Sequence, residues 1–305
     1  MLPYSTALAQ ESYPIHGLMG KIEHVDAKCQ RCLYGNLGGG WVSRPLFGYW
    51  YALPSIQSLR LAFPGYSRAD SQPLRVRPGG NLTAVTLTQW TRHSQFVSFF
   101  SGCTSLRKVV FSIDPHNSTD VSRQLFNLVT SLAGCRGTLK SLTILGPAQP
   151  LPDSVKHIRM TSLAGFTALK HLRLDAEVLL GLGYCTGILS LLLPLLLPHS
   201  LETLELRLMS WMQEDGKSPR PKPLLQHMLT QLSLLRRAME RGDFKWLRSV
   251  VLRLAREQWD EGGGEGEGME WYWAWREVPY IRQRLRDKGT TLSILWLDEK
   301  WREEE

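Results

Sequence analysis

The chain has 305 residues, of which 43% are hydrophobic, and a formal net charge of +8. This composition supplies a globular core and excludes a disordered chain. The longest apolar run, Ile188 to Leu197, is about half as long as a membrane span and contains Pro194. Residues 1–13 lack the basic residue and apolar run of a signal peptide. We therefore expect an intracellular protein, cytoplasmic, nuclear or both, without a membrane segment.

Residues 1–50 contain the run Gly38-Gly39-Gly40 and no repeat, and we expect an irregular N-terminal cap there. From residue 51 onward, a hexapeptide of the form Leu-x-x-Leu-x-Leu, with Ile, Val or Phe at some apolar positions, recurs along the chain. Its eight copies begin at Ile56, Leu82, Leu106, Leu139, Leu169, Leu201, Leu247 and Leu292. Such hexapeptides are typical of leucine-rich-repeat strands, whose alternate leucines point into a solenoid core.

The repeat predicts one α/β domain over residues 51–305, a horseshoe-like leucine-rich-repeat solenoid. About eight parallel strands should line its concave face, with irregular helices and loops on its convex face. Helices are predicted between the strands, at residues 120–132, 178–193, 223–239 and 277–288. The last of these has Pro279 in its first turn and Gly289 past its end. Insertions are expected near residues 210–223 and 258–270.

Alternation along the strands predicts which side chains point away from the core. This concave face should be mildly polar at first and strongly charged from the fifth predicted strand onward. Because Arg and Trp are frequent anchors in interfaces, we expect a protein partner there. The candidate partner-binding residues are Arg60, Lys108, His171, Arg173, Asp175, Glu205, Arg207, Arg253 and Trp296. The alternative is a solvated surface on which neighbours such as Arg173 and Glu205 pair with each other.

The positive charge is concentrated in one segment. Residues 217–256 contain ten Lys or Arg against Glu240 and Asp243, whereas residues 257–270 contain six acids and no base. Pairing between these neighbouring segments is favoured over a nucleic-acid surface. Nucleic-acid binding through residues 217–256 remains the alternative function.

No catalytic or metal-binding motif stands out. Five scattered cysteines favour reduced buried thiols over disulfides. Cys29-Gln-Arg-Cys32 supplies half of a structural zinc site; His16 and His24 could complete it, but ordinary thiols are favoured. The histidines lie in no catalytic motif, and residues 262–268 lack the Lys of a phosphate loop. We therefore expect no metal, no cofactor and no enzymatic activity.

Two segments resemble a known family. They are Phe166-Thr-Ala-Leu169-Lys-His-Leu172-Arg-Leu174 and Leu196-Leu-Pro198-His-Ser200-Leu201-Glu202-Thr-Leu204-Glu-Leu206. Both are similar to the repeats of fungal F-box and leucine-rich-repeat proteins, in which leucine-proline-x-serine-leucine-glutamate opens a strand. The resemblance covers residues 50–300 as a pattern and is specific over residues 166–206. It implies that the repeats hold a protein substrate while an N-terminal F-box binds the Skp adaptor of a cullin ubiquitin ligase.

The first 50 residues depart from that family. They contain no Leu-Pro-x-Glu followed by helical leucines, which is the F-box pattern. Two interpretations follow from this departure. Either the chain is a truncated gene model, so that contact with the Skp adaptor and cullin depends on an F-box outside it, or it is a substrate-binding module that has lost its coupling to the ligase. A generic leucine-rich-repeat scaffold unrelated to ubiquitin is a further alternative.

Overall fold

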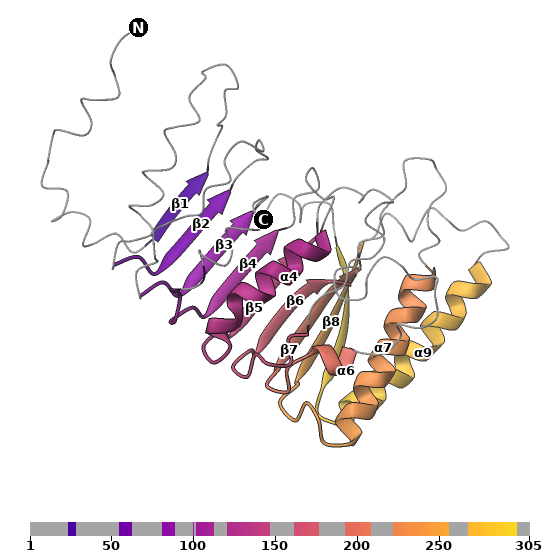
Figure 1. Cartoon of the computed structure of the whole chain (residues 1–305). Helices are drawn as coiled ribbons and strands as arrows, with labels where there is room; N and C mark the ends of the chain where they lie inside the picture. Colours follow the sequence, from indigo (N-terminus) through magenta and orange to yellow (C-terminus); the bar gives the residue numbers. More distant parts are fainter. Residues whose placement is uncertain are drawn as a thin grey trace, which may run out of the picture.

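In a computed structural model of the chain, the residues that the structure describes form one parallel sheet of nine strands, with helices on one side (Figure 1). The structure describes residues 24–28, 55–62, 81–88, 100, 102–112, 121–146, 162–176, 193–208, 222–255 and 268–297. The strands are β1 (His24–Lys28), β2 (Ser58–Ala62), β3 (Ala84–Thr88), β4 (Lys108–Ser112), β5 (Ser141–Leu145), β6 (His171–Asp175), β7 (Thr203–Leu208), β8 (Ser249–Ala255) and β9 (Thr291–Leu297). Each strand pairs with the next one along the chain. The arrangement is therefore solenoid-like.

Alternate strand residues stack in two rows that form the core. The rows are Val25, Leu59, Val85, Val109, Leu142, Leu172, Leu204, Val250 and Leu292, and Ala27, Leu61, Leu87, Phe111, Ile144, Leu174, Leu206, Leu252 and Ile294. Every described side chain in these rows is buried except that of Ile294, which is half-buried against the core. The predicted alternation is confirmed for β2 to β8, because each of these strands places the last two apolar positions of its hexapeptide in these rows.

Helices cover the core side of the sheet (Figure 1). They are α4 (Val121–Ser131), which continues as the 3-10 helix η3 (Leu132–Cys135), the single turn α6 (Leu193–Leu196), α7 (Lys222–Glu240) and α9 (Gly268–Arg286). Apolar side chains of α4, α7 and α9, such as Leu128, Leu232 and Ile281, join the same core as the strand leucines. The helices predicted at residues 120–132 and 223–239 are thus confirmed. None of the helices in the described ranges has the length and apolarity needed to cross a bilayer.

The two long helices end in the same way. Gly242 after α7 has φ of +93° and Gly289 after α9 has φ of +76°, values that favour glycine. The next residue in each case donates its N–H back into the helix, Asp243 to Ala238 O at 3.0 Å and Thr290 to Leu285 O at 3.0 Å. This pattern satisfies the last carbonyls and turns the chain toward the following strand.

The sheet begins earlier than the repeat predicted. β1 lies inside the expected irregular cap and pairs with β2 from His24 opposite Ser58 to Lys28 opposite Ala62. Its sequence, HVDAK, has apolar residues only at Val25 and Ala27. Because it contains no leucine, the hexapeptide pattern does not detect it.

The last strand is shifted by three residues from its predicted register. The prediction aligned Leu295 with Val250, whereas the structure aligns Leu292 with Val250. Leu295 consequently lies on the side away from the core, where it is 42% exposed. Trp296 aligns with the buried Leu254, whereas the prediction aligned it with Val251, so the register differs from the one on which its assignment to the concave face rested.

The physical reason for the shift lies in the residues that open the strand. In Thr-Leu-Ser-Ile-Leu-Trp-Leu, apolar residues are available on both alternations, so pattern alone does not choose the buried set. The buried Thr290 Oγ1 donates to Leu247 O at 2.5 Å, directly after the helix stop at Gly289. This anchor places Leu292 in the core row.

Helix α9 is longer than predicted, since it begins at Gly268 and takes in the end of the expected Gly/Glu insertion. Pro279 therefore lies inside the helix, not in its first turn. The proline is exposed, so its ring and missing N–H disturb only the solvent side of the helix. Cys29 and Cys32 lie outside the described residues, as do residues 178–192 of the helix predicted at 178–193, residues 210–221 of the insertion predicted at 210–223, and residues 258–267 of the insertion predicted at 258–270.

Candidate functional site

Residues that alternate with the core leucines line the opposite side of the sheet, which we call the outward face. From β2 to β9, its two rows are Ser58, Ala84, Lys108, Ser141, His171, Thr203, Ser249 and Thr291, and Arg60, Thr86, Val110, Thr143, Arg173, Glu205, Val251 and Ser293. All of these side chains are exposed or half-buried, in contrast to the core rows. Small polar residues dominate at first, and charged residues gather on β6 to β8.

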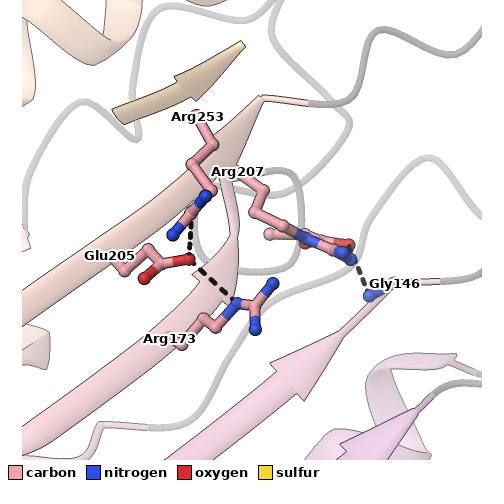
Figure 2. A network of polar contacts seen from close by, with 6 residues as sticks. Gly146, Arg173, Glu205, Arg207 and Arg253 are labelled. Carbon is pink, nitrogen blue, oxygen red and sulfur yellow. Dashed lines mark hydrogen bonds and ion pairs between the residues drawn. The ribbon is translucent and has the colours of Figure 1, made fainter. Parts of the chain in front are cut away.

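Glu205 lies at the centre of this charged group. Its Oε1 accepts a hydrogen bond from Arg253 Nε at 2.6 Å and lies 3.0 Å from Arg173 Nε (Figure 2). The three residues come from neighbouring strands, β7, β8 and β6, and all are half-buried. One carboxylate shared by two guanidinium groups leaves this cluster with one excess positive charge. We call these three residues the Glu205 cluster.

Asp175 and Arg207 form a second, buried ion pair at the ends of β6 and β7. Arg207 donates from Nε to Asp175 Oδ1 at 2.5 Å and from Nη2 to Oδ2 at 2.9 Å. The backbone N–H of Gly146 also donates to Oδ2, at 2.5 Å (Figure 2). Asp175 is 0% exposed and Arg207 7% exposed. The bidentate pairing and the third hydrogen bond offset the free-energy cost of removing these two charged groups from water.

This burial corrects the prediction that Asp175 and Arg207 line an accessible binding face. Strand alternation does point both side chains away from the core, as predicted. Strand alternation, however, does not predict whether other residues cover a side chain. Because the side chains of Asp175 and Arg207 are buried, they are not available for direct contact with a partner. They join the ends of β6 and β7 beside the Glu205 cluster.

The structure does not bring all the predicted partner-binding residues together. Arg173, Glu205 and Arg253 form one cluster, with His171 exposed one row away on β6. Arg60 lies on β2, four strands from Arg173, which is about 19 Å at a strand spacing of about 4.8 Å. Lys108 is exposed on β4, two strands from β6.

Sequence reasoning anticipated one contact and missed three, of which the Asp175–Arg207 pair is described above. The pairing of Arg173 with Glu205 follows from their neighbouring strands and is confirmed. The contact of Arg253 with Glu205 is diagonal, because Arg253 aligns with Arg207 and turns toward the carboxylate one row away. Gly146 contributes only a backbone N–H, for which a side-chain pattern carries no signal.

Two of the five cysteines lie among the described residues, and both are buried free thiols, as expected. Cys135 Sγ donates to Cys103 O at 2.8 Å, and burial raises the pKa of Cys135 to about 11. Within the described ranges, no three His, Cys, Asp or Glu side chains lie close enough together to hold a metal ion. Both thiols belong to the hydrophobic core.

Alkylation of the folded protein near pH 8 will label Cys135 on the order of a hundred times more slowly than an ordinary thiol. The thiolate is the reactive form, and a pKa about two units higher lowers its population about a hundredfold. Mass spectrometry of the labelled peptide, with the protein in denaturant as the reference, measures the ratio. Equal labelling rates in the two states would contradict the buried position of Cys135.

Comparisons of this chain with protein-family models, with curated proteins and with solved structures find no match.

Proposed function

We propose that the chain is a leucine-rich-repeat solenoid that serves as a non-catalytic protein-binding module, with the outward face as its binding surface. The observation that carries the proposal is the concentration of charged side chains on β6 to β8 of that face. The repeat class is supported by the sheet, in which strands follow chain order and hexapeptide leucines occupy the core rows. The helices on the core side are consistent with the same class.

The Glu205 cluster suits recognition because its members hold one another in place. Arg173 and Arg253 are each oriented by the same carboxylate, so less side-chain entropy is lost when a partner binds. The buried Asp175–Arg207 pair supports the adjacent strand ends. Small residues such as Thr203 and Ser249 flank the cluster and leave it open to a protein surface.

The resemblance of residues 166–206 to F-box and leucine-rich-repeat proteins refines the proposal. On this basis, the outward face holds a substrate of a cullin ubiquitin ligase. The refinement rests on the resemblance alone. Affinity purification of the full chain from its source cell, followed by detection of the Skp adaptor and cullin, tests it. Partners recovered without the adaptor or cullin would reject the ligase link and retain the binding module.

The outward face itself is tested by Val251→Arg. Val251 is half-buried and aligned with Glu205, so an arginine there places a long cation in the middle of the face. We expect partner capture to fall about tenfold or more, equivalent to about 1.4 kcal/mol, with little change in melting temperature. Quantitative mass spectrometry of captured proteins measures the loss.

The matched control is Glu277→Gln, which changes the net charge by the same amount at an exposed position on α9. This variant should capture the same proteins as the parent. If Val251→Arg also captures them in unchanged amounts, the outward face is not the binding surface.

The nucleic-acid alternative gains no support from the basic segment at residues 217–256. In its described part, Arg236 pairs with Glu240, and Arg241 lies 3.7 Å from Asp243. Arg253 pairs with Glu205. These cations lie on α7, on the following turn and on β8, and their ion pairs partly neutralise them.

A further inference from the structure

We propose that the edge at which strands β4 to β8 begin binds an acidic segment of a partner protein. We call this edge the basic rim. It consists of Arg107, Lys108, Lys140, Lys170, His171 and Arg248, together with the single acid Glu202. The basic rim is distinct from the Glu205 cluster, and its proposed role does not depend on a link to ubiquitin.

The backbone holds the rim residues in a line. The N–H groups of Lys140, Lys170, Glu202 and Arg248 donate, in order, to the carbonyls of Arg107, Lys140, Lys170 and Glu202, at 2.8, 2.9, 2.8 and 2.9 Å. Each step crosses to the next strand, so the line from Arg107 to Arg248 is about 19 Å long at about 4.8 Å per strand. An extended peptide of about six residues has the same length. The rim is therefore a linear array on a rigid support.

The basic rim has a large excess of positive charge, and its basic side chains are exposed to solvent. Five full positive charges face one carboxylate, and every basic rim side chain is exposed. Lys170 Nζ donates to Glu202 Oε1 at 2.6 Å, and this hydrogen bond lowers the pKa of Glu202, so the carboxylate is ionised at neutral pH. Arg107, Lys108, Lys140 and Arg248 form no ion pair with any residue in the part of the chain that the structure describes. These four cations are the ones an acidic partner would meet.

An exposed aromatic side chain lies at the β8 end of the rim. Trp246, two residues before Arg248, is 59% exposed in the turn between α7 and β8. Phe244, two residues before Trp246, is buried and has φ of 52°. Its ring stacks on that of His199, with the ring centroids 5.1 Å apart. That anchored turn directs Phe244 into the core and leaves Trp246 at the surface. Trp and Arg together are typical anchors of protein interfaces.

The mixture of charges favours a protein over a nucleic acid. Glu202 lies within the rim, and Asp243 lies in the turn that carries Trp246. A nucleic acid carries a phosphate at every unit and would meet both carboxylates with like charge. A protein segment can place acids opposite the free cations, neutral residues opposite Glu202 and an apolar residue against Trp246.

Fluorescence anisotropy with a labelled synthetic peptide tests the proposal. The probe is an extended peptide of alternating Glu and Ser with one Leu near its end, and the references are the same peptide with Gln for Glu and a single-stranded oligonucleotide of equal charge. We expect the full chain to bind the acidic peptide in preference to both references. Arg107→Glu combined with Lys140→Glu should weaken binding about tenfold or more, and Trp246→Ala should weaken it severalfold.

The matched control is Arg282→Glu combined with Arg286→Glu, which makes the same charge change on exposed positions of α9. It should leave peptide binding within about twofold of the parent. Equal losses in the two double variants, absence of binding to the parent, or preference for the oligonucleotide would each overturn the proposal. If the rim variant melts below the parent, the single variant Lys140→Gln provides the same comparison at an exposed side chain.

Discussion

Replacing Leu204 with Asp will unfold the sheet as one cooperative unit. Leu204 is 0% exposed and lies in the core row between Leu172 and Val250. Truncating a buried leucine costs about 2–5 kcal/mol, and a buried unpaired carboxylate costs more. The total approaches the roughly 5–15 kcal/mol by which a typical protein is stable. Because each strand buries its leucines against its neighbours, the loss is expected to spread along the stack.

Far-ultraviolet circular dichroism during heating measures this effect, and Thr203→Asp is its control. Thr203 is the preceding residue of the same strand, but it faces outward and is half-buried. The control should shift the midpoint by a few degrees at most. A parent-like melting curve for Leu204→Asp would show that the core register is wrong.

Removing one member of the buried Asp175–Arg207 ion pair will destabilise the fold strongly. Arg207→Met leaves Asp175 buried without its cation, and breaking such a pair typically costs about 3–5 kcal/mol. Chemical denaturation measures the change in unfolding free energy. The double variant Arg207→Met with Asp175→Asn should recover much of the loss, since no charge remains and the Asn oxygen can still accept from Gly146 N–H.

The exposed pair formed by Lys170 and Glu202 is the natural comparison. Its ion pair is short, at 2.6 Å, but lies at the surface, where solvent screens it. Lys170→Met should therefore change stability far less than Arg207→Met. Similar losses in the two variants would mean that the Asp175–Arg207 pair is not buried in solution, and the absence of recovery in the double variant would contradict the pairing itself.

These two results bear on function because the stable elements position the accessible ones. The leucine rows hold β6, β7 and β8 in register, and the buried pair joins the ends of β6 and β7. The Glu205 cluster lies near the middle of these three strands, and the basic rim runs along their starts and those of β4 and β5. A variant that leaves the melting curve intact but weakens binding can then be assigned to one surface or the other.

Local pattern alone predicted most of the fold. The apolar positions of each hexapeptide place alternate side chains on one side of a strand, so β2 to β8 and their core residues were recognisable without any long-range information. The helix α7 was recognisable from its apolar stripe and from Gly242, which permits the positive φ that ends it. The confirmed pairing of Arg173 with Glu205 followed from the order of the strands.

Tertiary structure decided what local pattern leaves degenerate. β9 offers apolar residues on both of its faces, and only the anchor at Thr290 selects Leu292 for the core. β1 has no leucine, so only its pairing with β2 identifies it as a strand. Arg253 contacts Glu205 from the adjacent strand, although the two residues are 48 positions apart in the sequence. Strand alternation predicts the direction of a side chain but not whether other residues bury it. Asp175 and Arg207 point away from the core, as alternation predicts, yet they form a buried ion pair and not an exposed binding surface.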